Sequence, residues 1–110
     1  MAQPSTATLR RRRCALVRKL PSLERLLRGS LLELYKPCGT PSCRCHQGRG
    51  HGPKYYLTVS HPGVPPQKDY VPEAYHEQVN EYLDNYRQVK EILKEICRIN
   101  DELLRRRQPL

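Results

Sequence analysis

The last third of the chain repeats apolar residues at alternating steps of four and three, the pattern of a helix with one apolar stripe. Pro72 suits the first turn of such a helix, and no glycine or proline follows it before Arg107. The pattern predicts a single helix over 72–107, about 50 Å long. The stripe comprises Tyr75, Val79, Tyr82, Tyr86, Val89, Leu93, Ile96, Asn100 and Leu103.

A helix of this length is too long to be covered by a domain of 110 residues. Asn100 stands at an apolar position of the repeat, where a lone asparagine specifies register and oligomeric state in coiled coils. We therefore expect a homodimer whose interface contains Val79, Tyr82, Tyr86, Val89, Leu93, Ile96, Asn100 and Leu103. The alternative is that the stripe packs on the chain's own sheet and N-terminal helices.

The first part of the chain predicts two short helices. Residues 1–8 are small and polar and are expected to be disordered. Residues 9–20 predict a basic helix that ends at Pro21. Ser22 can then cap a second short helix that ends at Gly29.

Three segments in the middle of the chain predict a small antiparallel sheet. They are Ser30–Lys36, 54–60 and Gln67–Val71, with a Pro/Gly-rich turn between the last two. The expected fold class is α+β, and the expected parts are a basic tail or helix over 1–21, a short helix with the sheet over 22–71, and a dimerisation helix over 72–107. Residues 22–107 are expected to form one domain.

Clustered cysteines lie between the first two predicted strands. Cys38, Cys43, Cys45 and His51 follow the spacing C-x4-C-x-C-x5-H in a loop rich in glycine and proline. Thiolate and imidazole are the ligands of closed structural zinc sites, so the spacing predicts a Zn²⁺ knuckle. His46 is the alternative fourth ligand, and a metal-free loop with reduced thiols is the alternative to zinc. Cys14 and Cys97 lie in helical patterns and are expected to be buried.

The net charge of +9 is concentrated at the front of the chain. Residues 1–30 hold eight Arg and Lys against one Glu, whereas residues 73–110 hold seven against eight acidic residues. This distribution favours a nucleic acid, DNA or RNA, as the partner, although a solvated basic tail is the alternative. The candidate contacts are Arg10, Arg11, Arg12, Arg13, Arg18, Lys19, Arg44, Arg49 and Lys54.

Seven tyrosines are the chain's only aromatic residues other than histidine, and they are expected to belong mostly to the core. Strand alternation places Tyr55 and Leu57 on one face and Tyr56 and Thr58 on the other, so at most one set reaches solvent. A tyrosine set on the exposed face could stack on single-stranded bases.

The sequence contains no recognisable catalytic constellation, and we do not expect an enzyme or a small-molecule substrate. No apolar segment is long enough for a signal core or a membrane span, and the odd number of cysteines favours a reducing compartment. A cytoplasmic nucleic-acid accessory protein is the leading expectation. A protein-interaction module acting through the last helix is second, and a thiol-based sensor is third.

Several strings resemble a family of uncharacterised prokaryotic proteins known as a domain of unknown function. They are Arg28-Gly29-Ser30-Leu31, the C-x4-C-x-C run with the preceding Tyr35, His51-Gly52-Pro53-Lys54-Tyr55-Tyr56-Leu57, Tyr70-Val71-Pro72, Asn85-Tyr86-Arg87 and Ile99-Asn100. Lys54 stands where the family usually has another aromatic residue. Members often lie near transposases, and the resemblance therefore implies a nucleic-acid accessory role without implying any catalytic residue.

Overall fold

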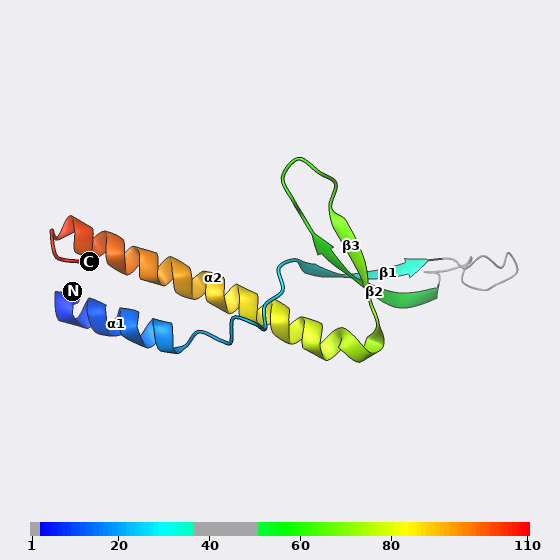
Figure 1. Ribbon diagram of the computed structural model, residues 1–110, viewed down its shortest axis with the longest axis horizontal. Coiled ribbons are helices and arrows are strands. Elements are labelled where there is room, and N and C mark those ends of the chain that lie inside the picture. Colours follow the sequence, from blue (N-terminus) through cyan, green and yellow to red (C-terminus); the bar gives the residue numbers. More distant parts are fainter. Residues whose placement is uncertain (1–2, 37–50) are drawn as a thin grey trace, which may run out of the picture. The chain divides into compact units, whose positions relative to one another are not determined.

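The computed structural model describes residues 3–36 and 51–110. Its elements are α1 (Thr6–Arg18), β1 (Ser30–Lys36), β2 (His51–Val59), β3 (Gln67–Val71), the 3-10 helix η2 (Glu73–Tyr75) and α2 (His76–Arg105) (Figure 1). The predicted α+β class is confirmed. The chain forms two compact units, one of Met1–Leu26 with Asp84–Leu110 and the other of Leu27–Leu83.

Helix α1 begins at Thr6, so the expectation of disorder up to residue 8 is wrong for the residues from Thr6 onward. The reason is an N-cap: Oγ of Ser5 accepts a hydrogen bond from the backbone N–H of Thr8, with 3.1 Å between the two atoms. The helix ends at Arg18, two residues before the predicted end.

The predicted second helix is absent from residues 22–29, where only residues 22–25 form a turn, closed by a hydrogen bond from the Arg25 N–H to the Ser22 carbonyl. A helix this short gains few bonds for the cost of nucleation. The Leu27 N–H instead donates to the carbonyl of Tyr82 in α2, at 3.2 Å between nitrogen and oxygen. Tertiary contact with α2 therefore replaces local helix in this segment.

The three strands pair antiparallel in the order β1-β2-β3. Strands β1 and β3 have the predicted bounds, whereas β2 begins earlier than the predicted residue 54. Residues opposite one another share a face of the sheet. One row across the sheet is Leu31, Leu57 and Asp69, and the next row, on the opposite face, is Leu32, Tyr56 and Tyr70.

One face of the sheet carries the core of the Leu27–Leu83 unit. Leu57 and Val71 pack with Val79 and Leu83 from the start of α2. The ring of Tyr55 meets the ring of His76 edge to face, with 4.5 Å between centroids. The face that contains Tyr55 and Leu57 is therefore the one covered by the helix.

Gly29 immediately precedes β1 and has a φ of 136°, a conformation that side chains rarely adopt. A Cβ at this position would lie 2.5 Å from the carbonyl oxygen of Thr58 on β2. The chain can thus enter the sheet at this point only because residue 29 lacks a side chain.

The other unit pairs α1 with the later part of α2, and the two helices lie side by side and antiparallel (Figure 1). Leu9 of α1 packs with Ile99 and Leu103 of α2, and Leu103 is fully buried. The basic N-terminal segment is thus a packed helix rather than a tail.

The helix predicted over 72–107 is shorter than expected. Pro72 is extended, with a ψ of 152°, and the 3-10 turn η2 separates it from α2. At the other end, Arg107 has a φ of 56°, which ends helical geometry after Arg105. Across the residues that the structure describes, neither α-helix combines the length and apolar character that crossing a membrane requires.

Candidate nucleic-acid interface

Helix α1 is rich in cations and contains no carboxylate in its own sequence. No acidic residue precedes Glu24 in the sequence. Arg11, Arg12, Arg18 and Lys19 are exposed, and among the described residues none of them forms a salt bridge. A surface depression on this helix is lined by Arg11, Cys14, Ala15, Arg18 and Lys19. This exposed surface of α1 is strongly positive.

Two other predicted contacts on α1 have roles inside the protein. Nη1 of Arg13 donates to Oδ1 of Asn100 on α2 at 2.7 Å. Nη2 of Arg10 donates to the carbonyl of Pro109 at 2.9 Å. These two side chains tie α1 to the C-terminal part of the chain, so they are less available to a phosphate than Arg11, Arg12, Arg18 and Lys19.

Helix α2 shows the contrasting case, because its cations are largely neutralised on its own surface. Ion pairs at three or four residues' separation join Arg87 to Asp84, Lys94 to Glu91, Arg98 to Glu95, and Arg105 and Arg106 to Glu102. Arg105 also pairs with Asp101, so Arg105 and Arg106 both have carboxylate partners at the end of α2. The positive field of this unit therefore arises from α1.

The remaining predicted contacts lie elsewhere. Arg44 and Arg49 lie outside the described residues. Lys54 is exposed on β2, and strand alternation places it on the sheet face that the helix does not cover. Lys68 of β3 lies on that same face and was missed by the sequence analysis. Combining the alternation of two strands with their register could have identified it.

The predicted zinc ligands Cys38, Cys43 and Cys45 also lie outside the described residues. His51 is the first residue of β2, and its Cα pairs with that of Lys36 at the end of β1. Within residues 3–36 and 51–110, no group of three or more metal-ligating side chains gathers. The alternative ligand His46 also lies outside the described part.

Cys14 and Cys97 are both exposed free thiols, so the expectation that they are buried is wrong. Each lies on a helix face away from the shared core. Their neighbours Arg13 and Ile96, by contrast, are half-buried. The sequence pattern correctly placed Cys14 and Cys97 on helices, but it did not indicate which face of each helix the other helix covers.

The predicted dimer stripe on α2 is partly occupied within one chain. Val79, Val89 and Leu103 are buried, and Asn100 bonds to Arg13 of the same chain. These positions therefore serve intramolecular packing, the alternative left open by the sequence. Tyr82, Tyr86 and Ile96 are half-buried, and Leu93 is 51% exposed.

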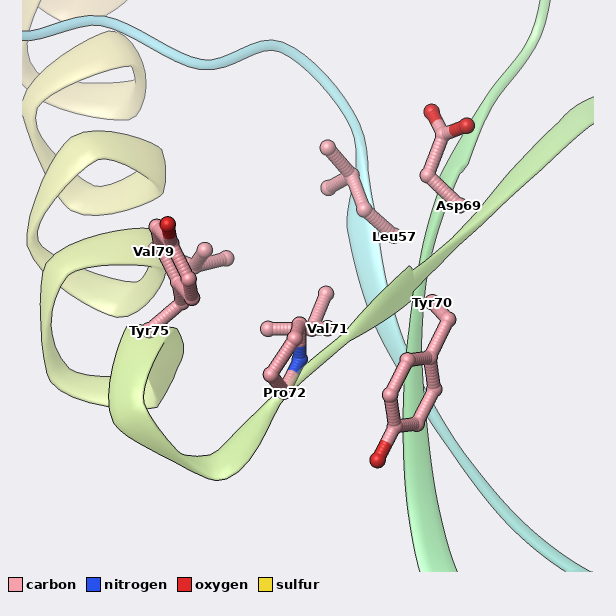
Figure 2. A pocket seen from close by; sticks show the side chains of 7 residues that line it. All are labelled: Leu57, Asp69, Tyr70, Val71, Pro72, Tyr75 and Val79. Atoms are coloured by element: carbon pink, nitrogen blue, oxygen red, sulfur yellow. The ribbon is translucent and has the colours of Figure 1, made fainter.

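An apolar pocket of about 270 Å³ lies between β3 and the start of α2. In Figure 2, Leu57 and Val71 point toward the helix, whereas Tyr70 lies on the other side of the strand. The pocket wall also includes Pro72, Tyr75 and Val79. Among the described residues that line it, the ionisable side chain other than tyrosine is that of Asp69, which accepts a hydrogen bond from Gln67 at 2.9 Å.

These features define a small α+β protein with a basic helix and a half-covered sheet. The chain belongs to the family described as a domain of unknown function (DUF6788), whose model matches residues 6–81. The match spans α1, the sheet and the first turns of α2. Comparison with curated proteins and with solved structures found no match.

Proposed function

We propose that this protein is a non-catalytic nucleic-acid-binding accessory protein and that α1 supplies its main contact with phosphates. The observation that carries the proposal is the contrast between α1 and α2. Arg11, Arg12, Arg18 and Lys19 are exposed without carboxylate partners in the described part of the chain, while the cations of α2 are mostly paired. Unpaired cations on one helix release condensed counterions when they meet a phosphate backbone.

Charge substitution tests this proposal better than truncation. Removing residues 1–20 would delete Leu9 and expose the core residue Leu103, so lost binding could reflect lost folding. The quadruple variant Arg11→Gln, Arg12→Gln, Arg18→Gln, Lys19→Gln keeps good helix formers and leaves the core untouched. Its matched control removes the same charge from α2: Arg87→Gln, Lys94→Gln, Arg98→Gln, Arg105→Gln.

Binding to a 20-base-pair DNA duplex is measured by fluorescence anisotropy over a series of salt concentrations. The wild type and the α2 control are expected to lose affinity steeply as salt increases. For the α1 variant, the magnitude of the slope of log affinity against log salt is expected to fall by about 3.6 if all four cations contact phosphates. If the α1 variant and the α2 control lose the same DNA affinity and the same salt slope, net charge and not the position of the cations determines binding. If the affinity of the wild type does not depend on salt, phosphate contact is rejected as its source.

Zinc is the second part of the proposal and is supported by the sequence. A closed tetrahedral zinc site takes four cysteine or histidine ligands close together in sequence. The chain offers such a set in Cys38, Cys43, Cys45 and His51. Such a site would leave no open coordination position, which fits a structural metal. Arg44 and Arg49 lie between these ligands in sequence and would be carried with them toward a phosphate.

A protein-interaction module acting through α2 is the second candidate function. The observation that favours it is the exposure of Leu93 in the apolar stripe. Leu93→Glu should then lower the apparent mass measured by analytical ultracentrifugation. A wild-type protein that sediments as a monomer at all concentrations would exclude self-association.

A further inference from the structure

The outer face of the sheet, opposite α2, has an unusual composition. Strand register assigns to it Ser30, Leu32 and Leu34 from β1, Lys54, Tyr56 and Thr58 from β2, and Lys68 and Tyr70 from β3. None of these residues is buried, whereas Leu57 and Val71 on the other face are. This outer face is thus the half of the sheet that the described elements leave open.

Two aromatic rings form the centre of the outer face. Tyr56 and Tyr70 are directly opposite in the β2–β3 pairing, and their rings meet edge to face with 5.7 Å between centroids. Tyr70 is 56% exposed, and Figure 2 shows its ring on the side of the strand away from α2. Tyr70 therefore offers an exposed ring on the sheet, packed against the half-buried ring of Tyr56.

Charge is segregated between the two faces of the sheet. Lys54 and Lys68 are exposed on the outer face, two residues from Tyr56 and Tyr70 along their strands. The described carboxylates of the strands, Glu33 and Asp69, pair in register with Tyr55 and Leu57 and so lie on the face toward α2. In the part of the chain that the structure describes, the outer face of the strands thus combines aromatic rings with positive charge on both sides and carries no carboxylate.

We infer that this outer face binds single-stranded nucleic acid, with bases stacking on Tyr56 and Tyr70 and phosphates contacting Lys54 and Lys68. The inference rests on the proposed function and specifies the strand state of the ligand. Bases of any sequence can stack on a tyrosine ring, but only when they are unpaired, and flanking lysines complement the backbone. A protein partner fits less well, because the described strand residues of this exposed face include two lysines and no carboxylate, which selects for an anionic ligand.

The test uses the full-length protein and two probes, a 12-nucleotide oligothymidylate and a 12-base-pair DNA duplex. Tyr56→Leu with Tyr70→Leu should lower affinity for the single strand by about tenfold to a hundredfold and affinity for the duplex by less than about twofold. Tyr75→Leu is the matched control, because Tyr75 is 55% exposed but lies on η2, outside this face. It should leave both affinities unchanged.

A second measurement tests whether a base of the bound strand stacks on the ring at position 70. The chain contains no tryptophan, so Tyr70→Trp introduces a single tryptophan on the outer face, whose emission can be excited without exciting the tyrosines. Oligothymidylate should quench its emission, while the same probe should not quench Tyr75→Trp. Lys54→Gln with Lys68→Gln should reduce the salt slope for the single strand by about 1.4.

The outcomes separate this inference from the proposed function. If the wild type binds neither probe at low salt, both fail. If it binds the probes but the tyrosine variants, confirmed as folded by circular dichroism, bind normally and Tyr70→Trp is not quenched, only the sheet inference fails. If those variants instead change the sedimentation of the free protein while single-strand binding persists, the face is an interface between copies and the inference is overturned.

Discussion

The guanidinium of Arg13 donates a hydrogen bond to Oδ1 of Asn100, with 2.7 Å between Nη1 and the oxygen. The sequence predicts a different role for each residue, a phosphate contact for Arg13 and an interchain register residue for Asn100. Their pairing joins α1 to α2 within one chain. It explains how a polar residue can occupy the apolar stripe without facing a second copy.

We expect Asn100→Ala to destabilise the protein by about 1–2 kcal/mol, because the charged guanidinium of Arg13 loses a partly buried acceptor. Urea denaturation of the wild type, both single variants and the Arg13→Ala, Asn100→Ala double variant measures the coupling energy. If Asn100 acts between chains instead, its loss should change the sedimentation behaviour while the coupling energy to Arg13 stays near zero.

Leu103 and Leu104 are adjacent but face different surroundings, with 0% and 52% of the residue exposed. Leu103→Ala should cost about 2–5 kcal/mol of unfolding free energy, since it leaves a cavity beside Leu9 and Ile99. Leu104→Ala should cost less than about 1 kcal/mol. Thermal or chemical denaturation measures the loss of unfolding free energy in each variant. Equal losses for Leu103→Ala and Leu104→Ala would contradict the described pairing of α1 with α2.

Gly29 and Gly63 both have positive φ, 136° and 77°, but differ in their surroundings. Gly29→Ala should destabilise by at least about 2 kcal/mol, because strain is added to a clash with the Thr58 carbonyl. At Gly63 a Cβ meets nothing within 4 Å, so Gly63→Ala should cost only about 1 kcal/mol. Comparable melting temperatures for the two variants would argue against the close approach of the chain to β2 at residue 29.

Hydrogen bonds from Arg106, and secondarily from Arg105, hold the pKa of Glu102 below its ordinary value of 4.5. Because the folded-state pKa is the lower one, this stabilisation is present above the unfolded-state pKa and is lost as pH falls through the folded-state pKa. Glu102→Gln should therefore be less stable than wild type at neutral pH, with a difference that shrinks below pH 4.5. Urea denaturation across this pH range is the measurement, and a pH-independent difference would contradict the assignment.

Removal of zinc is expected to lower the melting temperature, since the proposed ion cross-links the segment between β1 and β2. Native mass spectrometry should detect one Zn²⁺ per chain in the wild type and none after Cys43→Ser. Cys14→Ser and Cys97→Ser are the matched controls, because both thiols are exposed and outside the proposed ligand set. Metal-free wild type, with melting unaffected by a strong chelator, would falsify the zinc proposal.

Local chemistry was enough to predict most elements from the sequence. Strands Ser30–Lys36 and Gln67–Val71 have the predicted bounds, because β-forming residues are there bounded by Gly29 and by Pro72. The long C-terminal helix was predictable because its apolar repeat contains no glycine or proline. These signals are written in neighbouring residues, so they do not depend on how distant parts of the chain meet.

Which surfaces meet was decided only by the tertiary structure. An apolar stripe indicates that a helix face is covered but not what covers it, and here α1 supplies part of the cover through Leu9 and Arg13. The exposure of Cys97 likewise depends on which face of α2 is covered. Strand register places four residues on one face of the sheet: Lys54, Tyr56, Lys68 and Tyr70. Such pairings join residues far apart in the chain, and periodicity within one segment carries no information about them.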